Sequence, residues 1–171
     1  MFDRFSRREF SLTLASAIGA IPWFRSRSLR TKDVTKTSEA IHQEITLSAS
    51  AARVYAALTD APQFTKLMAF GSMKTAPPAE IARDVGGTFS LFAGHIIGRQ
   101  LELVPNQRIV QAWRVVDWPA GVYSVARFEI SDRAGKSVLV FDHTGFPNGL
   151  GEHLAQGWRT NYWEPLRKYL A

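Results

Sequence analysis

Ser137-Val-Leu-Val-Phe-Asp-His-Thr-Gly-Phe146 begins the stretch that decides the fold of this 171-residue chain. The stretch continues through Pro147-Asn-Gly149 into Leu150–Leu170. The first run is rich in β-branched and aromatic residues, which favours a β-strand. The second run has turn residues. The third run predicts one long helix with a stripe of large apolar side chains: Leu154, Trp158, Tyr162 and Leu166.

Strand parity predicts how this strand faces the helix. Leu139, Phe141 and His143 share one face, so His143 is expected to point inward, toward the helix that carries Trp158. The helix itself contains Pro165, which has no N–H to donate to a carbonyl one turn earlier. We therefore expect a kink just before this proline.

The elements before this stretch form a regular series. A strand over 41–47 precedes a helix over 51–58, and Asp60-Ala-Pro62 begins a second short helix, with aspartate as the cap. Short connections predict that the later strands pair antiparallel with their neighbours. These strands are expected at 88–92, 96–104, 108–116, 122–130 and 137–144.

Four stretches resemble one known family: Ala52–Asp60, Glu102–Trp113, His143–Phe146 and Gly157-Trp158. They are similar to the START-like (SRPBCC) superfamily and, within it, to the Aha1-like family of the Hsp90-ATPase-activator C-terminal domain. The resemblance spans residues 39–171. It implies an α+β helix-grip fold, in which a curved antiparallel sheet wraps a long C-terminal helix and two short helices follow the first strand.

The first 30 residues resemble a twin-arginine export signal. Arg7 and Arg8 are followed by Phe10 and by a weakly apolar run over 12–21. We expect this leader to engage the twin-arginine translocation machinery, with a linker at 31–38 and a periplasmic domain at 39–171. Two alternatives stay open: an uncleaved leader would tether the protein to the membrane, and the segment could be an ordinary N-terminal helix.

Charge and composition exclude several classes of protein. The formal net charge is +6, but residues 1–30 carry +4 of it, so the remainder has no clustered basic surface for nucleic acid. The chain has no cysteine, which excludes disulfides and thiolate metal sites. His95, His143 and His153 match no compact metal-ligand spacing. We expect neither a metal nor a cofactor.

Aromatic side chains around one histidine are the candidate ligand-binding site. An inward imidazole in an apolar pocket could orient a ligand or transfer a proton. The alternative is a core histidine that hydrogen bonds to its surroundings, among aromatic residues that are simply core. The candidate residues are Trp113, Trp118, Phe128, Phe141, His143, Phe146, Trp158 and Tyr162.

Three functions follow from these features. The first is an exported domain that binds a small hydrophobic molecule without catalysis. The second is an enzyme of the cyclase or hydrolase type that uses His143 as acid or base. The third is a protein-interaction module like the Hsp90 activators, which the export signal disfavours because it removes the protein from the cytoplasm.

Replacing both Arg7 and Arg8 with lysine should stop export, because the twin-arginine route recognises the arginine pair. Cell fractionation with an antibody against the protein measures this. The control replaces Arg25 and Arg27 with lysine and should leave the location unchanged. An unchanged periplasmic or membrane location in the first variant would refute the export hypothesis.

Overall fold

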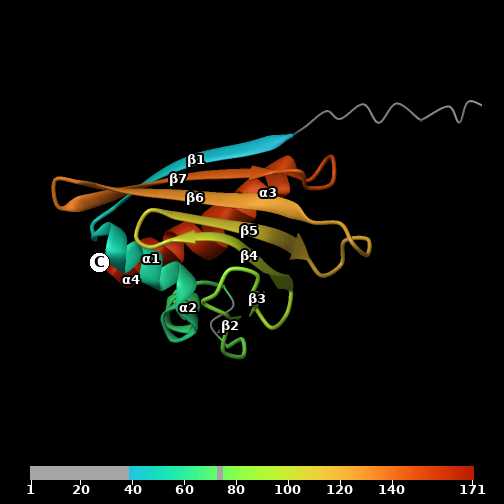
Figure 1. Ribbon diagram of the computed structural model, residues 1–171, viewed down its shortest axis with the longest axis horizontal. Helices are drawn as coiled ribbons and strands as arrows, with labels where there is room; N and C mark the ends of the chain where they lie inside the picture. Colours follow the sequence, from blue (N-terminus) through green and yellow to red (C-terminus); the bar gives the residue numbers. More distant parts are fainter. Residues whose placement is uncertain (1–38, 73–74) are drawn as a thin grey trace, which may run out of the picture. The chain divides into compact units, whose positions relative to one another are not determined.

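The computed structural model describes residues 39–72 and 75–171 (Figure 1). The predicted leader and linker lie outside the described residues. The elements follow in the order β1 (Ala40–Leu47), α1 (Ala51–Thr59), α2 (Ala61–Met68), β2 (Glu80–Ile81), β3 (Thr88–Leu91), β4 (Ile96–Val104), β5 (Arg108–Val115), β6 (Ser124–Arg133), β7 (Lys136–Thr144), α3 (Gly151–Trp158), η1 (Arg159–Trp163) and α4 (Glu164–Leu170).

The seven strands form one antiparallel sheet in the order β1-β7-β6-β5-β4-β3-β2. The first strand therefore lies beside the last, and the remaining strands follow as a meander. Figure 1 shows the final helix running along one face of this curved sheet. This is the predicted helix-grip fold, and the sequence analysis is confirmed at this level. The short β2 was not predicted, because two residues carry no periodicity.

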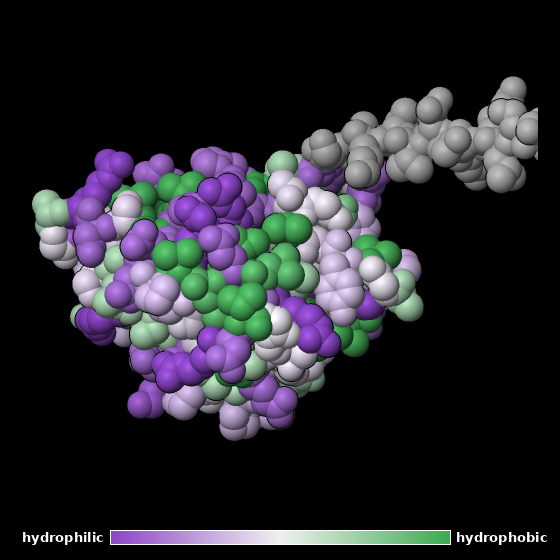
Figure 2. Space-filling view, viewed as in Figure 1, coloured by the Kyte–Doolittle hydropathy of each residue, from purple (hydrophilic) through white to green (hydrophobic). Residues whose placement is uncertain are grey.

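The inward face of the sheet has the predicted parity. Phe128 on β6 pairs with Phe141 on β7, and both rings are buried against the final helix. Ala126 pairs with His143 in the same row of inward side chains. Alternate residues face outward, where Figure 2 shows apolar and polar side chains interspersed over the visible face. One face of the sheet thus forms the core and the other meets water.

The two short helices begin at polar caps. The Ser50 side chain accepts a hydrogen bond from the Arg53 N–H at the start of α1. Asp60 ends α1 and caps α2, accepting from the Gln63 N–H at 3.1 Å. The backbone of Asp60 is extended, so the chain changes direction between the two helices, and α2 packs against α4.

The final helix contains a π-helical turn where the sequence predicted a kink. Residues 159–163 form the π turn, and the Glu164 N–H donates to the Arg159 carbonyl five residues earlier. Pro165 follows immediately and cannot donate to the Asn161 carbonyl. The wider turn accommodates the missing hydrogen bond without ending the helix. Among the described helices, none is long and apolar enough to span a membrane.

Gly98→Ala should destabilise the protein strongly. A β-carbon at this position of β4 would lie 2.1 Å from the Ala112 carbonyl oxygen and 2.3 Å from the Phe89 ring. Overpacking of this kind against backbone should cost about 3 kcal/mol of the free energy of unfolding. Urea denaturation followed by circular dichroism measures the change.

Gly157→Ala is the matched control for that substitution. Apart from its chain neighbours and the backbone of its own helix, a β-carbon at this position would meet no described atom within 4 Å. Because alanine favours a helix over glycine, the free energy of unfolding should rise by up to about 1 kcal/mol. Equal effects of the two substitutions would contradict the packing described for β4.

Candidate functional site

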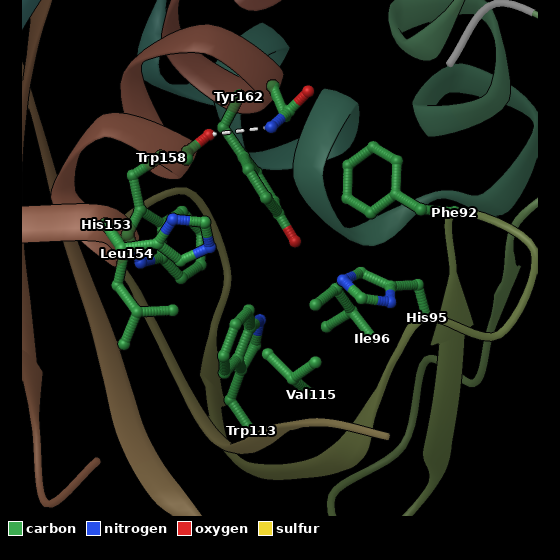
Figure 3. A pocket seen from close by; sticks show the side chains of 11 residues that line it. Phe92, His95, Ile96, Trp113, Val115, His153, Leu154, Trp158 and Tyr162 are labelled. Carbon is green, nitrogen blue, oxygen red and sulfur yellow. Dashed lines mark hydrogen bonds between the residues drawn. The ribbon is translucent and has the colours of Figure 1, made fainter. Parts of the chain in front are cut away.

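A cavity of about 110 Å³ opens between the final helix and the β3–β4–β5 side of the sheet (Figure 3). The helix contributes one wall, and the turn between β3 and β4 contributes another. Phe92, His95, Ile96, Trp113, Val115, His153, Leu154, Gly157, Trp158, Asn161 and Tyr162 line it. Most of these residues are apolar, as expected of a site that binds a small molecule.

Aromatic rings pack against one another in the walls of the cavity. The Tyr162 ring lies between Trp158, at 4.2 Å between ring centroids, and Phe92, at 5.4 Å. Trp113 on β5 lies 5.3 Å from Trp158. Each ring is buried and contacts at least one other wall ring, so interlocked aromatic side chains shape the cavity.

The turn after β3 holds its part of the wall in an unusual conformation. Phe92 has φ 53° and Ala93 has φ 59°, both in the left-handed region. A bulky residue rarely adopts this conformation, which is retained only where the surrounding packing requires it. Here the Phe92 ring packs on both Phe64 and Tyr162. His95 follows in the same turn. In Figure 3, His95 and His153 lie on opposite sides of Tyr162.

Two polar atoms within the wall have no hydrogen-bond partner among the described residues: Trp113 Nε1 and the Tyr162 hydroxyl. Burial raises the pKa of Tyr162, and the nearby indole N–H of Trp113 offsets only part of that effect. The hydroxyl is therefore protonated at any physiological pH. The two groups are close but do not meet in hydrogen-bond geometry, so both are left with unused hydrogen-bonding capacity.

The solvent end of the cavity is polar but holds no carboxylate. His95 and His153 are exposed, and neither aspartate nor glutamate lines the cavity. The Asn161 side-chain amide donates one hydrogen to the Gly157 carbonyl at 3.2 Å and accepts from the Ser72 hydroxyl at 2.8 Å. Among the described residues, no group of three acidic or histidine side chains could hold a metal ion.

His143 lies behind this wall in a closed hydrogen-bond network. The Trp158 indole N–H donates to His143 Nδ1 at 3.0 Å, so Nδ1 carries no proton. The proton must then be on Nε2, which lies 2.7 Å from the Ser124 hydroxyl. Ser124 in turn donates to the Trp113 carbonyl at 2.8 Å. Every polar atom of this network is satisfied within the protein.

Burial keeps this imidazole neutral. His143 has no exposed surface, and desolvation lowers its pKa from 6.5 to about 3. Both ring nitrogens are occupied and the side chain does not line the cavity. This geometry suits a residue that orients Trp158, and it offers no free nitrogen to a substrate.

The structure separates the candidate residues into two groups. Trp113, Trp158 and Tyr162 line the cavity. The others pack in the core behind it: Trp118, Phe128, Phe141, His143 and Phe146.

Sequence reasoning missed several residues of the wall. His153, Gly157 and Asn161 form a second helical stripe beside that of Trp158, and widening the stripe by one position would have found them. Phe92 and His95 carry no such signal, because a turn reveals nothing of what it faces.

The final helix is also attached to β1, at the edge of the sheet. The Glu39 carboxylate accepts from the N–H groups of Gly149 and Gly151, at 2.8 and 2.9 Å, where α3 begins. Gln43 donates to the Ala155 carbonyl at 3.0 Å and accepts from the Trp163 indole N–H. These contacts and that of His143 determine which side of the helix faces the cavity.

Comparison with known proteins places these features in context. The family model described as "Activator of Hsp90 ATPase homolog 1-like protein" matches residues 48–171. The human activator of 90 kDa heat shock protein ATPase homolog 1 is 32% identical over 94 residues, which cover 55% of this chain and 28% of the human protein. An uncharacterized protein of Schizosaccharomyces pombe is 31% identical over 138 residues, which cover 81% of this chain and 39% of that protein.

Solved structures show the same fold. An Hsp90 activator from Plasmodium falciparum has 28% sequence identity and a TM-score of 0.65, covering 72% of this chain and 90% of that one. CalU16 from Micromonospora echinospora, at 18% identity, has a TM-score of 0.64 and covers 77% and 76%, respectively. The second likeness shows the fold alone. The chain spans less than half the length of the curated relatives described above.

The buried imidazole predicts a loss of stability in acid. His143 has a pKa of about 3 in the folded protein and of 6.5 when exposed in the unfolded chain. Below pH 6.5 the unfolded chain binds a proton that the folded protein does not, so stability falls as the pH drops toward 3. This side chain alone should lower the free energy of unfolding by about 2 kcal/mol between pH 7 and pH 5.

A His143→Gln variant isolates that contribution. Glutamine can still accept from the Trp158 indole and donate to Ser124, but it does not titrate. Urea denaturation of both proteins at pH 7 and pH 5 is the measurement, and the variant should lose about 2 kcal/mol less than the parent. The same loss in both proteins would show that His143 is not held neutral.

Proposed function

The chain belongs to the family of activator of Hsp90 ATPase homolog 1-like proteins, and from that membership and its cavity we propose that it binds a small hydrophobic molecule. The ligand would lie between the final helix and the sheet, against Trp113, Trp158 and Tyr162. The proposal needs no catalytic residue. His143 serves it indirectly, because its hydrogen bond holds Trp158 in the wall.

The observation that carries this proposal is an aromatic cavity in an otherwise close-packed core. Protein interiors leave few spaces larger than a water molecule. A cavity of about 110 Å³ is of the same order as the engineered apolar cavity of about 150 Å³ that holds benzene. One six-membered ring therefore matches its size.

We also propose that the protein acts outside the cytoplasm. The arginine pair and the apolar run of the first 30 residues favour export by the twin-arginine route, which carries folded proteins. The protein would then bind its ligand in the periplasm, or at the membrane surface if the leader is retained. The domain is compatible with this route, because a chain without cysteine needs no oxidative folding step.

A second candidate function is favoured by the relatives that carry the activator name. Human and Plasmodium falciparum proteins described as Hsp90 activators are 32% and 28% identical to this chain over the matched regions. The module would then bind an Hsp90-type chaperone through its surface. Measuring the ATPase rate of a purified bacterial Hsp90 with and without this protein tests that role. An unchanged rate at saturating protein would reject it.

Cumene, a branched single-ring hydrocarbon, should bind in the cavity. In a ¹⁵N–¹H spectrum of the protein, titration with cumene should shift the indole N–H signals of Trp113 and Trp158, whose rings line the cavity. Gly157→Leu should weaken binding at least about tenfold, because its side chain would enter the open space beside the helix.

Gln156→Leu is the matched control for cavity filling. It adds the same side chain at the neighbouring helical position, which is exposed and does not line the cavity. Binding should be unchanged. If cumene shifts neither indole signal, or if the two leucine variants bind it equally, the cavity is not the binding site.

A further inference from the structure

The cavity wall specifies the polarity of its ligand as well as its size. Trp113 and Tyr162 are 3% and 5% exposed, and Trp113 Nε1 and the Tyr162 hydroxyl have no hydrogen-bond partner among the described residues. A buried polar group without a partner is costly, so such atoms commonly mark where a ligand completes the hydrogen bonds. Figure 3 shows the Tyr162 ring extending into the pocket with its hydroxyl end foremost.

The chemistry of the two groups selects the complementary atom. An indole N–H only donates. The tyrosine hydroxyl remains protonated, since burial raises its pKa, and its hydrogen is available to a partner. The two donors, one on β5 and one on the final helix, lie close together, so a single acceptor atom beside both can accept from each of them.

The surroundings argue against a charged group at that point. No aspartate, glutamate, lysine or arginine lines the cavity, and the two histidines lie at its exposed end. A buried carboxylate or ammonium without a countercharge is strongly unfavourable. The acceptor that fits is therefore neutral, such as the oxygen of a ketone, an ester or an amide.

On the basis of the ligand-binding function proposed above, we infer that the natural ligand is an uncharged single-ring compound whose carbonyl-type oxygen accepts hydrogen bonds from Trp113 Nε1 and the Tyr162 hydroxyl. The ring would occupy the space between Phe92, Trp158 and Leu154. The indole and the phenol would thus distinguish a carbonyl compound from a hydrocarbon of the same shape.

Four probes of nearly equal shape test this inference: cumene, acetophenone, benzoate and benzamidinium. Each has a phenyl ring and a branched substituent. The substituent is apolar in cumene, a neutral acceptor in acetophenone, anionic in benzoate and cationic in benzamidinium. Acetophenone should bind the full-length protein at least about tenfold more tightly than cumene, as expected for hydrogen bonds to otherwise unpaired donors. Benzoate and benzamidinium should bind more weakly than acetophenone.

Tyr162→Phe removes one donor and keeps the ring. It should lower the affinity for acetophenone about tenfold relative to the affinity for cumene, because the hydrogen bond to the carbonyl oxygen is lost and the ring is kept. The control Tyr123→Phe removes a hydroxyl from an exposed ring that does not line this cavity, and it should change neither affinity. Urea denaturation of both variants verifies that they fold.

The outcomes separate this inference from the function on which it rests. If none of the four probes binds, the ligand-binding function fails. If cumene and acetophenone bind equally, or if Tyr162→Phe affects both alike, the cavity binds rings but does not select a carbonyl oxygen, and the Trp113 indole N–H donates to the Tyr162 oxygen instead. Tightest binding of benzoate or benzamidinium would overturn the neutral acceptor in favour of a charged ligand recognised at the histidine end or by the aromatic faces.

Discussion

The hydrogen bond from the Trp158 indole to His143 is the contact on which the rest of the site depends. It joins the final helix to β7, and through Ser124 the same imidazole is linked to β6 and to the Trp113 carbonyl on β5. One side chain thus connects three strands and the helix. A neutral imidazole is required, because a protonated Nδ1 could not accept the indole hydrogen. Burial ensures that state by lowering the pKa of His143.

Because this hydrogen bond holds Trp158 in place, it also positions Tyr162, which lies one helical turn further along. Tyr162 follows Trp158 at a spacing of four residues and packs on it, so its hydroxyl is directed into the cavity. The π turn at 159–163 lies at this point, where the helix must pass Pro165. Glu39 and Gln43 hold the helix from β1 in the same orientation. The aromatic wall is therefore built on a helix with little freedom to rotate.

The family and the cavity support different aspects of function. Membership of the family indicates the fold of the domain. Some relatives of this chain are described as Hsp90 activators. The cavity is a property of this chain's own residues, above all of the two donors in its wall. A binding function explains why those donors lie unpaired inside an apolar surface, whereas a purely surface-mediated interaction leaves them unexplained. The leader adds a proposed location outside the cytoplasm.

The sequence by itself determined the architecture and much of the inward face. Alternation in the last strand predicted that Phe141 and His143 are buried, and the apolar stripe predicted the final helix, because both depend on periodicities that are local in the chain. Only the tertiary structure decided which aromatic residues line a cavity and which fill the core. Phe92 and His95 come from a turn, and Trp113 from a strand with two apolar faces, so their positions depend on long-range packing against the helix. Periodicity shows which side of an element is buried, whereas an unfilled space arises from how several elements fit together.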